Sequence, residues 1–188
     1  MSTWLRSISY LLFAAFLAGC VTGPDDKADA TAKKRSLDAD ADATLTRLYT
    51  TADGSKELVR KAYGALIFPS VLAGGVVVGA EYGEGVLRSK GRTVDYYNLT
   101  SGSVGFQLGA QSKAVIVLFM TKDAYDKFRS SSGWTAGADA SVALLKIGAG
   151  GSIDTNTVTQ PVVGFVMTNA GLMYNLTLEG TKITRLDL

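Results

Sequence analysis

Apolar residues recur at helical spacing in the first part of the chain with a regular pattern. Leu45, Leu48, Tyr49 and Ala52 follow the i, i+3, i+4, i+7 spacing of one helix face. A second stripe consists of Leu58, Val59, Ala62 and Tyr63. Asp53-Gly54 lies between the stripes and predicts a break or cap there. The pattern therefore predicts two amphipathic helices ahead of the rest of the domain.

From Ala65 onward the apolar period changes to two, the spacing of β-strands. Residues 104–111 alternate large apolar with small or polar side chains, whereas residues 114–120 are apolar on both faces and predict a central buried strand. Residues 172–178 alternate again, and Asn169-Ala170-Gly171 predicts a turn that joins them to "VVGFVM".

One helix interrupts the strands. Thr121 is suited to be its N-cap, and Lys127 and Arg129 fall in its last turn. Its apolar face consists of Ala124, Tyr125 and Phe128. The predicted fold class is α+β: a mainly antiparallel, strongly bent β-sheet or partly closed barrel, with N-terminal helices and one inserted helix.

The glycine-rich stretch "FPSVLAGGVVVGAEYGEGVL", residues 68–87, raises the question of a phosphate-binding loop. Gly74 and Gly79 have the G-x-x-x-x-G spacing, but Ala80-Glu81 follows where such a loop needs Lys and Ser or Thr. Gly83 and Gly85 lead into a strand-like segment and do not open a helix. We therefore expect these glycines to serve close backbone packing, bulges or a positive φ in a bent sheet.

The N-terminus "MSTWLRSISYLLFAAFLAGC" has Arg6 followed by a short apolar run and small residues before Cys20. The run matches a secretory signal and is too short to span a bilayer. "LAGC" resembles the bacterial lipoprotein lipobox, which implies cleavage before Cys20 and attachment of fatty acyl chains such as palmitate. Val21 favours sorting to the outer membrane. The alternative is a free buried thiol after an ordinary signal peptide.

The following polar segment lacks aromatic residues and predicts a disordered tether. The expected organisation is a signal peptide at residues 1–19, a lipidated Cys and tether at 20–42, and one folded domain at 43–188.

The amino-acid composition excludes several kinds of catalytic and metal site. The 188-residue chain has no histidine and one cysteine, so neither a histidine-dependent catalytic triad nor a His/Cys zinc site can form. Its net charge of +2 argues against a dedicated nucleic-acid binder. We expect no enzyme activity, no cofactor and no metal; an unrecognised enzyme using Asp, Glu, Tyr or Ser is the least favoured alternative.

Two groups of cations are candidate lipid contacts. Lys56, Arg60 and Lys61 lie off the apolar stripe of the second helix, which can face a membrane or simply leave its cations in solvent. Arg88, Lys90 and Arg92 alternate, which predicts one cationic face of a hairpin, unless the charges only protect an edge strand. Glu81 and Glu84 have no third ligand nearby and are expected to be turn residues.

Three blocks carry a resemblance to a known family. "ALIFPSVLAGGVVVGAEYGEGVL", "YYNLTSGSVGFQLGAQSKAVIVLFM" and "AGLMYNLTLEGTKI" resemble, in order, the blocks of the SYLF domain, over about residues 43–188. The resemblance implies binding of phosphoinositide or other anionic lipid and, in fungal members, of actin. It also implies a lipid site on a basic segment ahead of the first block, where Lys56, Arg60 and Lys61 lie here.

The leading hypothesis is an outer-membrane lipoprotein, facing the periplasm or the cell surface, whose domain binds anionic lipid. The alternative is a structural or interaction module of the envelope without a small ligand, with protein partners that the sequence does not identify.

Overall fold

The computed structural model of the chain describes residues 26–75, 78–104, 111–145, 153, 159–168, 171–173 and 178–188. The helices are α2 (Asp26–Thr51), α3 (Ser55–Lys61) and α4 (Lys122–Ser130). The longer strands are β1 (Gly64–Gly75), β2 (Val78–Ser89), β3 (Arg92–Val104), β4 (Gln111–Phe119) and β7 (Val162–Thr168). The shorter ones are β5 (Trp134–Thr135), β6 (Ala143–Leu144), β8 (Gly171–Met173) and β9 (Lys182–Arg185).

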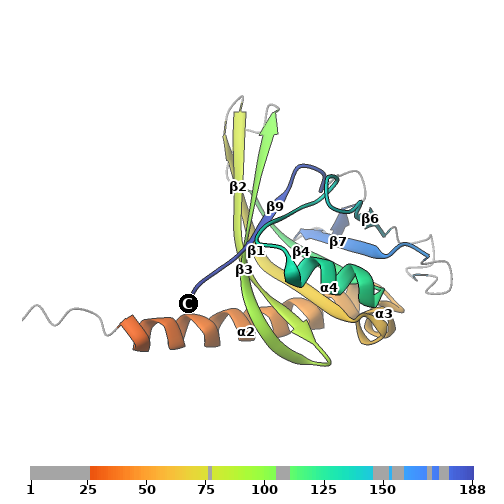
Figure 1. Cartoon of the computed structure of the whole chain (residues 1–188), viewed down its shortest axis with the longest axis horizontal. Helices are drawn as coiled ribbons and strands as arrows, with labels where there is room; N and C mark the ends of the chain where they lie inside the picture. Colours follow the sequence, from red (N-terminus) through yellow and green to blue (C-terminus); the bar gives the residue numbers. More distant parts are fainter. Residues whose placement is uncertain are drawn as a thin grey trace, which may run out of the picture.

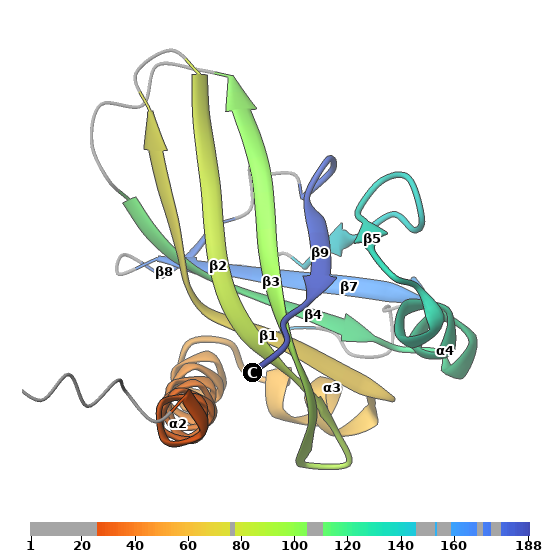
Figure 2. The same ribbon diagram turned by 60° about the vertical axis from the view of Figure 1, so that its left-hand side comes forward.

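The strands form one curled sheet, the half-barrel seen in Figures 1 and 2. Its order is β5-β9-β3-β2-β1-β4-β7-β6, with β8 paired to β7 off this path. Among the described pairs, β6–β7 is parallel and the others are antiparallel. The predicted α+β fold with a mainly antiparallel, bent sheet is therefore confirmed.

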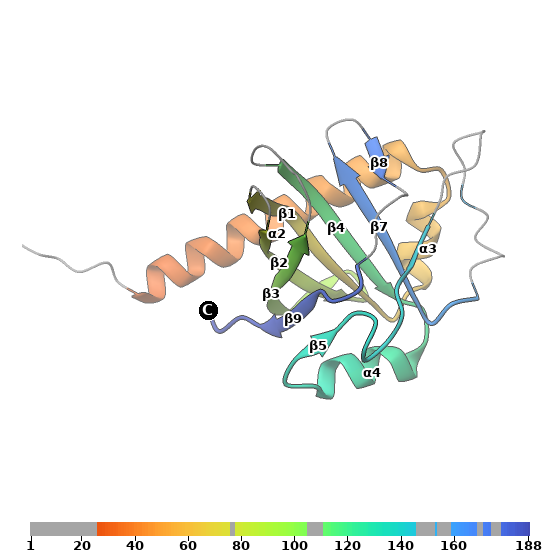
Figure 3. The same ribbon diagram turned by 90° about the horizontal axis from the view of Figure 1, so that it is seen from above.

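The centre of the sheet is buried on both faces, because α2 and α3 cover one face and α4 the other (Figure 3). Residues 114–119 of β4 are all buried, as expected for a central strand. Ile116 packs toward the helices α2 and α3, whereas its neighbours Val115 and Val117 pack with Phe128 of α4. Successive side chains of β4 thus belong alternately to two separate apolar cores.

The N-terminal helix is longer than the sequence pattern predicts. The disordered tether expected up to residue 42 is wrong from Asp26 onward, because α2 begins there and continues to Thr51. Its polar composition hides a sparse stripe at spacings of three and four residues that the sheet buries: Leu37, Ala41, Leu45, Leu48 and Ala52. Burial of this stripe against the sheet stabilises a helix that its own sequence supports weakly.

Local signals correctly predict the break after α2 and the ends of α4, whereas α3 ends at Lys61, before the predicted stripe residues Ala62 and Tyr63. Gly54 separates α2 from α3 with a left-handed φ of 88°, which favours glycine. The Thr121 hydroxyl accepts a hydrogen bond from the backbone N–H of Ala124 at 3.3 Å and caps α4. Lys127 and Arg129 lie in the last turn of α4, as predicted.

The strand β1 contains a bulge. The register of β1 shifts around Phe68-Pro69 against both neighbouring strands. A Cβ on Gly85 would lie 2.2 Å from the carbonyl oxygen of Ile67, and one on Gly83 would lie 2.8 Å from Val71 Cγ2. These two glycines therefore permit close backbone packing beside the bulge.

The other two glycines of the glycine-rich stretch, Gly74 and Gly79, differ from Gly83 and Gly85. Gly74 has no atom within 4 Å of an added Cβ, and Gly79 is paired with Gly75 in the ladder. The described glycines with a positive φ lie elsewhere, at residues 54, 91, 137, 171 and 180. The packing account is confirmed at Gly83 and Gly85 and is wrong for Gly74, and none of these three has a positive φ. For Gly79 the account stays a prediction.

Parts of two predicted strands lie outside the described residues. Of residues 104–111, β3 includes Val104 and β4 begins at Gln111. Of residues 172–178, β8 includes Leu172 and Met173. Residues 169 and 170 of the predicted turn lie outside the described residues, and its third residue, Gly171, pairs with Thr168.

Candidate functional site

A cleft of about 620 Å³ lies where α2, α3 and the turn between β2 and β3 meet. Figure 2 shows this turn and α3 at the same end of the molecule, beside α2. The apolar lining of the cleft consists of Leu45, Tyr49, Val59, Ala62 and Ala65. Both the volume and the apolar lining are typical of sites that bind small molecules.

Four of the six predicted lipid contacts line this one cleft. Lys56 and Arg60 come from α3, and Arg88 and Lys90 come from the β2–β3 hairpin. Lys56 and Arg60 are four residues apart on the exposed side of α3. Lys90, at φ 52°, and Gly91, at φ 75°, form the turn that brings the hairpin cations to the cleft. Two groups that are separate in the sequence are therefore one group in space.

Three of these cations are available for a ligand. Among the described residues, no ion pair engages Lys56, Arg60 or Lys90. All three are exposed. An apolar cleft bordered by unpaired cations is chemically suited to an amphiphile that has an anionic group.

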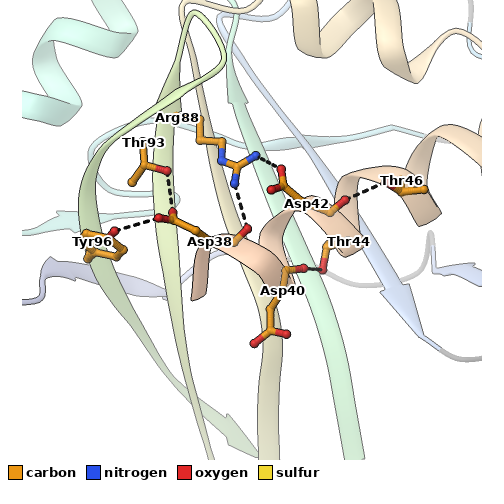
Figure 4. A network of polar contacts seen from close by, with 8 residues as sticks. All are labelled: Asp38, Asp40, Asp42, Thr44, Thr46, Arg88, Thr93 and Tyr96. Atoms are coloured by element: carbon orange, nitrogen blue, oxygen red, sulfur yellow. Dashed lines mark hydrogen bonds and ion pairs between the residues drawn. The ribbon is translucent and has the colours of Figure 1, made fainter. Parts of the chain in front are cut away.

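Arg88 is instead engaged by α2 in a polar network, which we call the Asp38 clasp (Figure 4). Its guanidinium forms an ion pair with Asp42 and donates a hydrogen bond to the Asp38 carbonyl oxygen at 2.9 Å. The Asp38 carboxylate accepts from the Thr93 hydroxyl at 2.7 Å and from the Tyr96 hydroxyl at 3.2 Å. The clasp holds α2 onto the β2–β3 hairpin and so fixes two walls of the cleft relative to each other.

Tyr49 lies within the electrostatic reach of this ion pair. Burial raises the pKa of the Tyr49 hydroxyl, Arg88 lowers it to a lesser degree, and Asp42 raises it. The net shift is upward, so the hydroxyl stays protonated at neutral pH and can donate a hydrogen bond to an anion in the cleft.

Lys61 borders a second, adjoining cleft of about 520 Å³. Arg60 and Lys90 line both clefts, and Tyr63, Lys122 and Tyr125 line the second. Lys61 is paired with Glu57 at 2.8 Å, and its hydrogen bond lowers the pKa of that carboxyl. It is thus less available to a ligand than Lys56.

The prediction that Arg88, Lys90 and Arg92 share one hairpin face is wrong. The turn at Lys90-Gly91 interrupts the alternation, and Arg92 on β3 pairs with Ser89 rather than with Arg88. Arg92 is exposed and lines neither of the two clefts described above.

Glu81 and Glu84 lie within β2, not in the turn that the sequence suggests. Glu81 is paired with Lys113 and Glu84 with Lys33, each at 2.8 Å. A search of the described residues finds no group of acidic or cysteine side chains that could hold a metal ion.

Cys20, the predicted lipidation site, lies outside the described residues. Within the part of the chain that the structure describes, no helix has the length and apolar character needed to cross a membrane.

The fold and the cleft define an α+β half-barrel with a cationic, partly apolar site. Residues 100–187 match the model of the Ysc84 family, described as "Las17-binding protein actin regulator". This is the family that the sequence resembles, so the match confirms that resemblance over residues 100–187. No curated protein matches the chain.

The match begins at Thr100 and leaves out α2, α3, β1 and β2. The four cations that line the first cleft therefore lie ahead of the matched residues, and the start of the domain at residue 43 remains a prediction. The family suggests lipid-related or actin-related binding in general terms.

Proposed function

We propose that this protein is a non-enzymatic outer-membrane lipoprotein, anchored through Cys20, whose domain binds anionic lipid in the cleft between α2, α3 and the β2–β3 turn. The observation that supports it most strongly is the convergence of Lys56, Arg60 and Lys90 on an apolar cleft. Each cation near an anionic lipid surface contributes about 1 kcal/mol. The apolar wall adds affinity for the part of the lipid next to its head group.

The helix α2 limits how an anchored domain can meet the membrane. Residues 21–25, between Cys20 and α2, reach at most roughly 18 Å when fully extended. Asp42, at the cleft, lies roughly 24 Å along the helix from its start at the usual rise per residue. A lipid of the same leaflet reaches the cleft when α2 lies along the membrane rather than standing upright on it.

Vesicle co-sedimentation tests the lipid site. The assay uses residues 20–188 with Cys20→Ser, which retain every helix, strand and core contact described above. Vesicles of phosphatidylcholine alone are compared with vesicles containing phosphatidic acid. We expect binding to the anionic vesicles that weakens as NaCl rises from 10 to 150 mM, because the screening length falls from about 30 to about 8 Å.

Charge reversal then locates the site. Lys56→Glu, Arg60→Glu and Lys90→Glu should each weaken binding by about 30-fold, since reversal removes one attraction of about 1 kcal/mol and adds a comparable repulsion. Arg92→Glu is the matched control, because it lies two residues from Lys90 but outside the cleft. Equal loss in Arg92→Glu would indicate a diffuse surface attraction, and no binding by the folded wild type would favour an envelope-interaction module.

The anchor has its own test in the full chain. Cys20→Ser should prevent acylation and release the protein from the membrane fraction, because the cysteine sulfur is the predicted site of the acyl chains. Mass spectrometry of the mature N-terminus checks the modification directly. A correctly trimmed Cys20→Ser protein that still fractionates with the outer membrane would contradict the lipoprotein assignment.

A further inference from the structure

The ion pair between Arg88 and Asp42 lies in the lining of the cleft, and its two partners differ sharply in exposure. The Arg88 side chain is 13% exposed, whereas the Asp42 side chain is 68% exposed. Arg88 is held independently of this pair, because it also donates to the Asp38 carbonyl oxygen at 2.9 Å. Asp42 can therefore leave without releasing Arg88 from its place in the wall.

We propose that Asp42 occupies the position of the ligand's anionic group, and that a phosphate monoester with an apolar tail displaces Asp42 from Arg88. This inference rests on the proposed function and makes Arg88 a ligand-binding residue. The exchange replaces one anion by another on the same guanidinium, so no buried charge is left unpaired. The released Asp42 carboxylate remains hydrated because it is already mostly exposed.

The charges of the cleft favour a phosphate monoester over a carboxylate. Asp42 supplies one negative charge, whereas Lys56, Arg60 and Lys90 add three unpaired cations to the same lining. A phosphate monoester has close to two negative charges at neutral pH and three acceptor oxygens. The Arg88 Nε is buried and has no hydrogen-bond partner among the described residues, so the guanidinium is not saturated by protein acceptors.

Arginine is also the side chain best matched to this exchange. Its planar guanidinium forms strong hydrogen bonds with both carboxylate and phosphate. Tyr49 lines the same cleft as both partners of the pair, and burial raises the pKa of its hydroxyl, which therefore remains a donor. Leu45 and Val59 provide the apolar wall beside this group.

Calorimetric titration with dihexanoyl phosphatidic acid tests the exchange in residues 20–188 with Cys20→Ser. Asp42→Asn should raise the affinity, because the ligand then no longer competes for Arg88. Asp40→Asn removes the same charge from the same helix at a position outside this cleft, and serves as the control. The affinity should increase about threefold or more beyond any increase in the Asp40→Asn control. A difference of this size lies within the range of coupling energies measured between residues in contact.

A double-mutant cycle separates the exchange from general electrostatics. In an Arg88→Gln background, Asp42→Asn should lose the excess gain, because no guanidinium remains to be freed. If the gain is the same with and without Arg88, the exchange is refuted even though the cleft still binds lipid. If the wild type binds neither the anionic vesicles nor dihexanoyl phosphatidic acid, the proposed function itself fails.

Thermal unfolding provides a second measurement should Arg88→Gln not fold. Asp42→Asn should lower the melting temperature of the free protein but leave that of the ligand-saturated protein unchanged, because the pair is already broken there. An equal decrease in both states overturns the exchange. Inorganic phosphate that binds as tightly as the lipid would support the exchange and assign the site to soluble phosphate monoesters, whereas equal binding of dihexanoyl phosphatidylcholine would overturn it.

Discussion

Different kinds of side-chain contact hold the helices on the two faces of the sheet. On the α4 face, aromatic rings pack closely: Phe128 lies 4.6 Å from Phe119, 4.9 Å from Tyr97 and 5.8 Å from Trp134, measured between ring centroids. On the α2 face, the buried apolar side chains of the helix are aliphatic, and the hydrogen bonds and ion pair of the Asp38 clasp hold it to the hairpin.

The α4 face contributes mainly to stability, whereas the α2 face borders the cleft. Interlocked aromatic rings fill the space under α4 and contribute packing energy beyond the area that they bury. Polar contacts join α2 to the hairpin beside the cleft between α2, α3 and the hairpin. A polar clasp has a small net free energy, because its groups also bond to water in the unfolded chain. We therefore expect the α2 face, rather than the α4 face, to change if a ligand binds in the cleft.

The largest expected effect is at the aromatic face. Phe128→Ala should lower the free energy of unfolding by about 3–5 kcal/mol, because it removes a fully buried ring from the centre of the cluster. Chemical denaturation of wild type and variant measures the change. Lipid binding by the fraction that remains folded should not change, since Phe128 is on the face opposite the cleft. Loss of binding at full folding would contradict the division between the two faces.

Where the structure depends on local signals, the sequence predicts it well. The cap at Thr121, the break at Gly54 and the buried run at residues 114–119 each follow from a few adjacent residues. The start of α2 does not, because Leu37 and Ala41 are isolated among polar residues and become helical through contacts with strands far along the chain.

The same reasoning applies to the candidate site. The sequence identifies the cations of the second helix and of the hairpin, but their meeting in one cleft depends on the turn at Lys90-Gly91 and on the placement of α2. The role of Asp42 could not be predicted, because its partner Arg88 is 46 positions away. Alternation alone gave the wrong face for Arg92, since a two-residue turn resets the pattern.

The second prediction concerns the bend that both faces share. Gly85→Ala should cost about 3 kcal/mol, because its Cβ would lie 2.2 Å from the Ile67 carbonyl oxygen and force the bulged strand to move. Gly74→Ala, in the same glycine-rich stretch, should be nearly neutral because the space around it is open. Urea unfolding of the two variants gives the comparison. Equal costs would contradict the account in which close packing at the bulge requires Gly85.

The smallest effect is expected at the clasp. Asp38→Ala should lower the free energy of unfolding by about 1–2 kcal/mol, because the Thr93 and Tyr96 hydroxyls lose their common acceptor. Amide hydrogen exchange should show reduced protection in α2 and little change in α4. Asp40→Ala, on the exposed side of the same helix, is the matched control.

The contribution of the clasp to the free energy of unfolding should depend on pH. Burial, and then the Asp38 charge and its hydrogen bond, raise the pKa of Tyr96 in the folded protein. A raised pKa in the folded state means that the stabilisation is complete below the unfolded value of about 10 and is lost as the pH rises through the folded value. The wild type should therefore lose stability above about pH 10, and Asp38→Ala should lose less, because one cause of the shift is gone. An identical alkaline loss in both proteins would show that Asp38 does not hold Tyr96, and hence that the clasp does not fasten α2 to the hairpin.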